Sequence, residues 1–218
     1  MKKVVPWLVA IAVLVVVGAG FYGWWALDLR WRPHTIKTHQ AEIGKALEGA
    51  GWVSPQRGTN ATGSRKLYMV SYRSCPDCIR FEEEMFPKLQ AAGVDTRVIM
   101  IARADYNGQS KSSPPERATV AELWINRSWK LYQQWTAVKP PTAWTAPGVA
   151  PADGDMARTA VVDAGRNLVE QLRPMLKDND IKFAYPTLIW WDDKGVMRGC
   201  ACEKAQTYRY VLKELGAS

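Results

Sequence analysis

The residues best suited to chemistry in this chain are the two thiols of the motif Cys75-Pro76-Asp77-Cys78. A thiolate attacks a disulfide sulfur and forms a mixed disulfide, which a second thiol then resolves. Two cysteines separated by two residues at the start of a helix lie one turn apart, near enough for this second step. We therefore expect thiol–disulfide exchange, with Cys75 as the exposed nucleophile and Cys78 as the resolving thiol.

The flanking residues predict how the motif is held. Residues 66–73 are mostly apolar and predict a buried strand, and the apolar spacing of residues 79–92 predicts a helix that is interrupted near Pro87 and ended by Gly93. Residues 94–102, rich in Val and Ile, predict a second strand. The predicted order is strand, Cys-x-x-Cys turn, helix, strand.

This order places the first sulfur of the motif at a helix N-terminus. The unpaired amides and the helix dipole there stabilise a thiolate. Pro76 fits the first helical turn because the donor it lacks has no helical acceptor. Asp77 disfavours the thiolate by its negative charge, whereas Arg73 and Arg80 favour it.

The second half of the chain predicts a helical region followed by a hairpin. A capping box at Ser113 begins one long amphipathic helix that continues to about residue 138, and a second helix is expected at about 155–176, kinked near Pro174. Tyr185-Pro186 leads into a strand at 188–191, a turn at 192–195, a short strand at 196–199 and a last helix at about 204–215.

These motifs together resemble the thioredoxin superfamily, and most closely its periplasmic thiol:disulfide interchange proteins of the DsbC/DsbG kind. The resemblance covers about residues 66–216 and rests on Cys75-Pro76-Asp77-Cys78 after a strand, a helical insertion at about 112–180, and Tyr185-Pro186-Thr187 before the hairpin. It implies an α/β, thioredoxin-like fold with a helical insertion. The implied activity is a thiol:disulfide oxidoreductase acting on protein substrates, with a membrane redox partner and no cofactor beyond the cysteine pair.

The resemblance also implies a role for Pro186. In that family the proline before the hairpin is cis and faces the Cys-x-x-Cys, where it limits metal capture and leaves backbone groups free to pair with an extended substrate. Tyr185 departs from the Thr or Val that usually precedes this proline, which puts substrate fit beside Cys75 in question. The segment before the first strand is too short for the dimerisation domain of the isomerases, which weakens an isomerase assignment. Reductase, isomerase and oxidase directions all stay open.

The pair Cys200 and Cys202, expected just after the last strand, lies outside the family pattern and allows three interpretations. The two thiols are structural, or they form a second redox pair that exchanges electrons with Cys75 and Cys78, or all four cysteines hold a zinc ion. The last interpretation describes a non-catalytic zinc-binding or scaffold module, which is the alternative function. Two off-stripe tryptophans, Trp129 and Trp144, are further candidates for lining a groove that binds unfolded chains.

The N-terminal segment predicts a membrane anchor. Residues 4–27 contain no charged side chain, and a helix of this length reaches roughly 36 Å, enough to cross a bilayer. A cleaved signal peptide with small residues at 18–20 is the alternative, but the apolar run is longer than a usual signal core. A short tail with Lys2 and Lys3 favours a cytoplasmic N-terminus, so the remaining chain is expected in the periplasm as part of a single-pass inner-membrane protein.

Composition and charge bound the rest of the interpretation. Apolar residues at 47% and charged residues at 23% exclude a disordered chain and a polytopic membrane protein, and 4 Cys in 218 residues are too few for a disulfide-stapled scaffold. Half of the net charge of +8 lies within residues 1–37, so the basic balance reflects anchoring and gives no reason to expect nucleic acid. We expect an anchor at 1–28, a juxtamembrane helix and linker at 29–65, and the thioredoxin-like domain at 66–218.

Overall fold

The computed structural model describes residues 5–55 and 65–217. Residues 1–4 of the predicted anchor, including Lys2 and Lys3, residues 56–64 of the predicted linker and residue 218 of the predicted domain lie outside the described residues. The chain divides into two compact units, Met1–Arg32 and Pro33–Ser218. The first contains helix α1 (Val5–Leu27) and a 3-10 turn η1 (Leu29–Trp31). One apolar helix in this unit is long enough to cross a membrane, as the sequence predicts.

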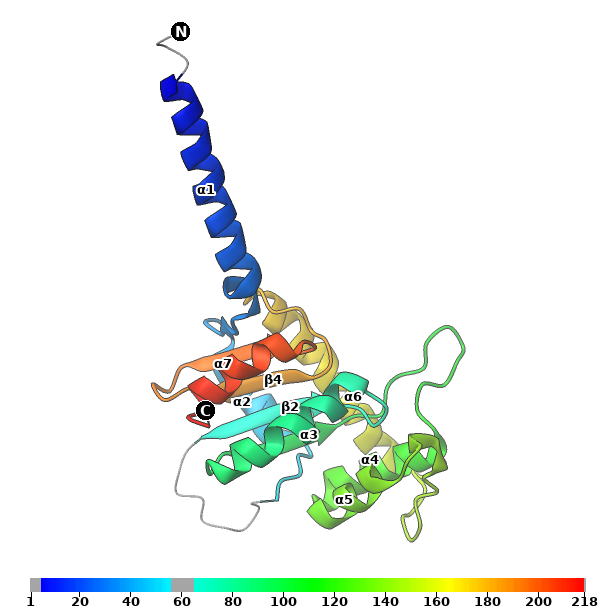
Figure 1. Cartoon of the computed structure of the whole chain (residues 1–218). Coiled ribbons are helices and arrows are strands. Elements are labelled where there is room, and N and C mark those ends of the chain that lie inside the picture. Colours follow the sequence, from blue (N-terminus) through cyan, green and yellow to red (C-terminus); the bar gives the residue numbers. More distant parts are fainter. Residues whose placement is uncertain (1–4, 56–64, 218) are drawn as a thin grey trace. The chain divides into compact units, whose positions relative to one another are not determined.

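The second unit is a mixed α/β domain around a five-stranded sheet (Figure 1). The strands are β1 (His34–Thr35), β2 (Lys66–Ser71), β3 (Asp95–Met100), β4 (Thr187–Trp191) and β5 (Met197–Ala201). Their spatial order is β1-β5-β4-β2-β3. Only β2 and β3 are parallel, joined by the crossover helix α3 (Pro76–Ala91), while β4 pairs antiparallel with both β2 and β5.

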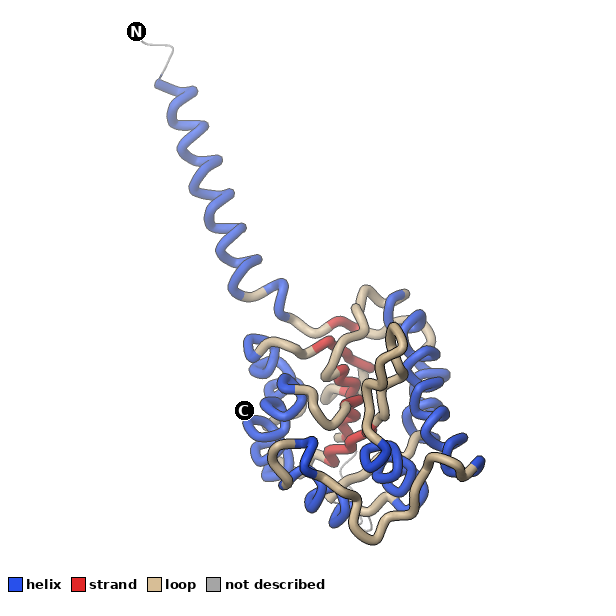
Figure 2. Tube along the Cα trace, turned by 90° about the vertical axis from the view of Figure 1, so that its right-hand side faces the viewer, coloured by secondary structure: helices blue, strands red, loops and turns tan. Residues whose placement is uncertain are grey.

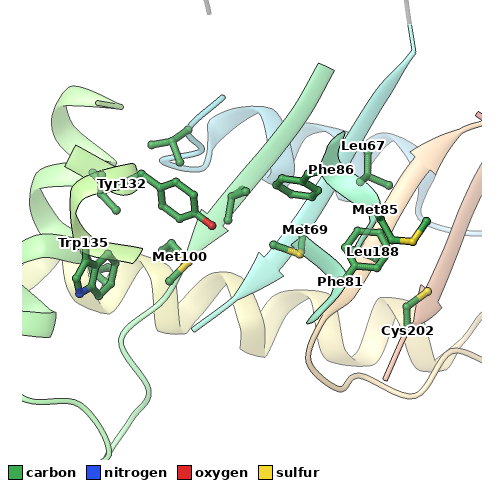
Figure 3. Packing of buried hydrophobic residues seen from close by; sticks show 14 of the residues in the cluster. Leu67, Met69, Phe81, Met85, Phe86, Met100, Tyr132, Trp135, Leu188 and Cys202 are labelled. Atoms are coloured by element: carbon green, nitrogen blue, oxygen red, sulfur yellow. The ribbon is translucent and has the colours of Figure 1, made fainter. Parts of the chain in front are cut away.

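Helices cover both faces of the sheet, which lies between them in Figure 2. Because side chains alternate along a strand, Leu67 and Met69 of β2 enter one hydrophobic cluster and Tyr68 and Val70 the other. The first cluster packs against α3, α4 (Pro114–Asn126), α5 (Trp129–Ala137) and α7 (Tyr208–Glu214). The second packs against α2 (Gln40–Gly49) and α6 (Met156–Lys177). Figure 3 shows the first cluster, including Phe81 of α3 and Leu188 of β4.

The strand–turn–helix–strand order predicted around the first cysteine pair is confirmed, but α3 is not interrupted at Pro87. The helix runs through this proline to Ala91. Phe86 and Leu89 on either side of Pro87 are buried in the first cluster, and their packing offsets the hydrogen bond that the proline removes. Pro174 likewise lies inside α6, which continues to Lys177.

The single long helix predicted for residues 114–138 is wrong, because the structure has two helices there. Arg127 adopts a left-handed conformation with φ of 51° and ends α4. The Ser128 side chain then accepts a hydrogen bond from the Leu131 amide and begins α5. Ser128 was the signal in the sequence for the break between α4 and α5, because serine is a preferred N-cap residue.

The hairpin of β4 and β5 is confirmed, with β5 shifted toward the C-terminus. Gly195 has a φ of 73°, and the Asp192 carboxylate accepts hydrogen bonds from the amides of Lys194 and Val196. In the register that follows, Leu188 lies opposite Cys200 and Thr187 opposite Ala201. Cys200 therefore belongs to the last strand. The prediction that it follows this strand is wrong.

Candidate active site

The first cysteine pair lies where β2 ends and α3 begins. The Cys75 amide donates to the Tyr72 carbonyl at 3.1 Å, which turns the chain out of the strand. Cys75 is the N-cap of α3, and its Sγ accepts a hydrogen bond from the Cys78 amide at 3.1 Å. Pro76 is the first residue of the helix. Cys75 and Cys78 form a disulfide with their Cα atoms 5.2 Å apart.

The expectation that Cys75 is exposed is wrong for this disulfide form. Cys75 is 2% exposed and Cys78 is 1% exposed, although Ser74 and Pro76 beside Cys75 are both exposed. The reason is the bond itself, because the Cys75 sulfur is joined to the sulfur of Cys78 on the buried side of α3. The site is therefore at the surface of the domain, while its sulfur atoms are shielded from solvent.

Arg80 links the motif to the C-terminal part of the chain. Its guanidinium pairs with Asp77 at 2.7 Å and donates to the Glu203 carbonyl at 2.6 Å. The hydrogen bond from Arg80 Nε to the Tyr208 hydroxyl is the main cause of a raised Arg80 pKa. The negative charge between the two cysteines thus has a direct cationic partner, as the sequence suggested.

Arg73, the other cation predicted to favour the Cys75 thiolate, contacts the end of α5. The residue is 4% exposed, and its Nη2 donates to the carbonyls of Trp135, Thr136 and Val138 at 3.1, 3.2 and 2.6 Å. A cation at a helix C-terminus satisfies carbonyls that have no helical donor. Hydrogen bonds from Arg73, two residues before Cys75, therefore hold the C-terminal end of α5 beside the end of β2.

A half-buried carboxyl, that of Glu82, lies one helical turn beyond Cys78, and the sequence had not singled it out. The Tyr132 hydroxyl donates to Glu82 Oε2, and burial raises the pKa of Glu82 to about 7, although Tyr132 and Arg73 act in the opposite direction. Burial also raises the pKa of Tyr132 well above its usual range. The signal in the sequence was the spacing, because residues four apart on a helix share a face. Glu82 also lines a cavity of about 480 Å³ between α3 and α5.

The peptide bond between Tyr185 and Pro186 is cis, as the resemblance implied. Thr187, the next residue, begins β4 and pairs with Val70 of β2, so Pro186 lies beside the end of the strand that leads to Cys75. The Tyr185 ring meets the Tyr72 ring edge-on at 5.0 Å, and burial raises the pKa of Tyr185 to about 12.

The second cysteine pair is joined to the same region through the backbone. Cys200 and Cys202 form a disulfide, and they are 6% and 0% exposed. The Cys202 amide donates to the Pro186 carbonyl at 2.9 Å. Each cysteine is thus bonded within its own motif, and among residues 5–55 and 65–217 no group of three or more His, Cys, Asp or Glu side chains is placed to hold a metal ion.

The two tryptophans predicted to line a groove differ in their surroundings. Trp129 is half-buried and stacks on Tyr132 at 4.9 Å. Trp144 is 9% exposed, and its Nε1 donates to the Thr119 hydroxyl at 2.7 Å. Trp144 also lines a second cavity, whose lining includes Ser74, the residue before Cys75.

No protein-family model matches this chain, and a search of curated proteins finds no relative.

Proposed function

We propose that this protein is a thiol:disulfide oxidoreductase that exchanges disulfides with protein substrates, with Cys75 as the attacking and Cys78 as the resolving thiol. The observation that carries the proposal is the position of Cys75 as the N-cap of α3, with its Sγ accepting the Cys78 amide. In the reduced protein the same amide donates to a thiolate, and the helix dipole acts in the same sense. These contacts favour the reactive form of Cys75.

The proposed reaction moves two electrons by two exchanges. The Cys75 thiolate attacks one sulfur of a substrate disulfide, forms the mixed disulfide and releases the other substrate sulfur as a thiolate, which takes up a proton. The Cys78 thiolate then attacks the Cys75 sulfur, releases the second substrate thiolate and closes the Cys75–Cys78 disulfide. The reverse sequence oxidises a substrate dithiol. A partner that accepts or supplies two electrons completes either cycle, and we place it in the membrane.

A thioredoxin-type fold is part of the same proposal. It is supported by the parallel β2–α3–β3 unit with the Cys-x-x-Cys at its first turn, by the antiparallel β4–β5 hairpin, and by the closing helix α7. Helices α4, α5 and α6 correspond to the helical insertion. Tyr185 and Pro186, beside the end of β2, would shape the substrate site.

We further propose that α1 anchors the domain in the inner membrane with residues 33–218 in the periplasm. The apolar helix and the two cysteine pairs, both as disulfides, support this compartment, because disulfides persist in oxidising spaces.

The decisive test is trapping of the mixed disulfide. Cys78→Ser removes the resolving thiol, so adducts with substrate proteins should accumulate through Cys75 and disappear on reduction; Cys75→Ser is the matched control and should trap none through this position. The same purification reports zinc content. A correctly folded Cys78→Ser protein that forms no adducts, or stoichiometric zinc lost on changing either cysteine pair, would refute the oxidoreductase proposal.

A further inference from the structure

A cavity of about 520 Å³ is lined in part by Ser74, directly before Cys75, and most of its charged lining residues are cationic. It lies between the β2–α3 turn, the loop that follows β3 and the start of α4. Trp135 and Trp144 form apolar walls. Four cationic side chains contribute to it, but only one carboxyl group does. The cations are Arg73, Arg103, Lys111 and Arg117.

Three of these cations, Arg73, Arg103 and Lys111, have no carboxylate within ion-pair distance among the described residues. Arg117 is neutralised, because it forms a bidentate pair with Asp153 at 2.7 and 2.6 Å. Arg73 and Arg103 form no ion pair, and their hydrogen bonds go to backbone carbonyls and to the Ser74 hydroxyl. The Nε of each is buried without a hydrogen-bond partner. Arg73 is in addition almost fully buried, and the carboxyls that act on it electrostatically, Glu82 and Glu116, form no ion pair with it.

Glu116, the one carboxyl group of the cavity, does not compensate both arginines. It forms no ion pair with either arginine, and burial raises its pKa although hydrogen bonds with Ser112 and Ser113, and then the charges of Arg103 and Arg73, act in the opposite direction. The N-terminus of α4 contributes few donors, because Pro114 and Pro115 occupy its first two positions and lack N–H groups. The positive charge of the cavity is therefore carried by side chains, namely Arg73, Arg103 and Lys111.

We propose that this cavity binds a carboxylate of the polypeptide whose cysteine reacts at Cys75, an Asp or Glu within a few residues of that cysteine. A guanidinium matches a carboxylate in shape and charge, and the tryptophan walls accommodate the apolar part of the segment. The cavity adjoins Ser74, and a chain advances by about 3.3 Å per residue, so the two sites are within reach of one short segment. The part of this proposal in which the bound polypeptide reacts at Cys75 rests on the proposed function, whereas the binding of a carboxylate in the cavity does not.

Binding without redox chemistry tests the cavity. The probes are two blocked hexapeptides with Ser in place of the reactive cysteine, one with Glu two residues away and one with Gln, titrated calorimetrically into the full chain in detergent at low salt. We expect the Glu peptide to bind about tenfold more tightly, the typical effect of one charge-assisted contact. Arg103→Gln should reduce this ratio to below about twofold, and Lys111→Gln should reduce it less. Arg173→Gln, the same change at an exposed arginine of α6, is the control and should preserve the ratio.

Equal affinities for the two peptides, or a preference that survives Arg103→Gln and Lys111→Gln in folded protein, would overturn the proposal. A second series uses the same peptides with cysteine and measures mixed-disulfide formation by the Cys78→Ser protein. Adducts without any acidic preference would refute the carboxylate site and leave the oxidoreductase proposal standing. Carboxylate-selective binding with no adducts would refute the oxidoreductase proposal and leave the carboxylate site standing.

Discussion

The half-buried carboxyl of Glu82 predicts an uncommon pH dependence of stability. An unfolded Glu titrates near 4.5, whereas in the folded protein the pKa of Glu82 is about 7. Between these values the folded state binds more protons than the unfolded state, so the free energy of unfolding falls as pH rises. One pKa unit corresponds to about 1.4 kcal/mol, which gives an upper limit of about 3 kcal/mol lost between pH 4.5 and 7. Because the side chain borders a cavity, we expect about 2 kcal/mol.

The perturbation that isolates this effect is Glu82→Gln, which keeps an oxygen acceptor for the Tyr132 hydroxyl and removes the titration. Denaturant unfolding of the wild-type and variant chains, followed by tryptophan fluorescence in the same detergent from pH 5 to 8, gives the two stability curves. The variant should lose less stability than the wild type by about 2 kcal/mol over this range. Subtraction removes the contributions of all groups that the two proteins share. Parallel curves would refute the reasoning, as would a Glu82 carboxyl resonance that titrates near 4.5 in the folded protein.

Two further predictions concern packing and the second disulfide. Gly51→Ala should lower the free energy of unfolding by about 2–3 kcal/mol, because an added Cβ would lie 2.3 Å from Trp124 Cα. Denaturant unfolding measures this loss. Gly49→Ala is the control, because nothing lies within 4 Å of a Cβ added there. Unchanged stability in Gly51→Ala would contradict the close approach. Replacing both Cys200 and Cys202 by Ser should cost about 1–2 kcal/mol, as expected for a short closed loop, and a variant as stable as the wild type under oxidising conditions would show that the bond adds nothing.

Local signals predicted the elements around the first cysteine pair. The apolar residues of β2 and β3 and the amphipathic spacing of α3 are patterns within one segment, and these elements appear close to the predicted positions. The break between α4 and α5 was missed because the apolar stripe continues across Arg127 and Ser128, where backbone conformation decides.

The chemistry that surrounds the site depended on contacts between distant segments. Glu82 meets Tyr132 across 50 positions of the chain, and Arg73 reaches Val138 across 65. No periodicity within α3 or α5 specifies which residue of one faces the other. The Cys-x-x-Cys motif could be identified from the sequence, but the Glu82–Tyr132 contact and the cationic cavity could be identified only from the fold.

The register of the β4–β5 hairpin restricts how the length of this part of the chain can vary. Cys200 lies opposite Leu188, and the Cys202 amide binds the Pro186 carbonyl. Inserting or deleting one residue in the turn at 192–196 would slip β5 by one position and turn Cys200 toward the other face of the sheet. The hydrogen bond to Pro186 would be lost in the same step. Related chains that keep Cys-x-Cys here should therefore vary in the identity of their turn residues and keep the number of residues constant.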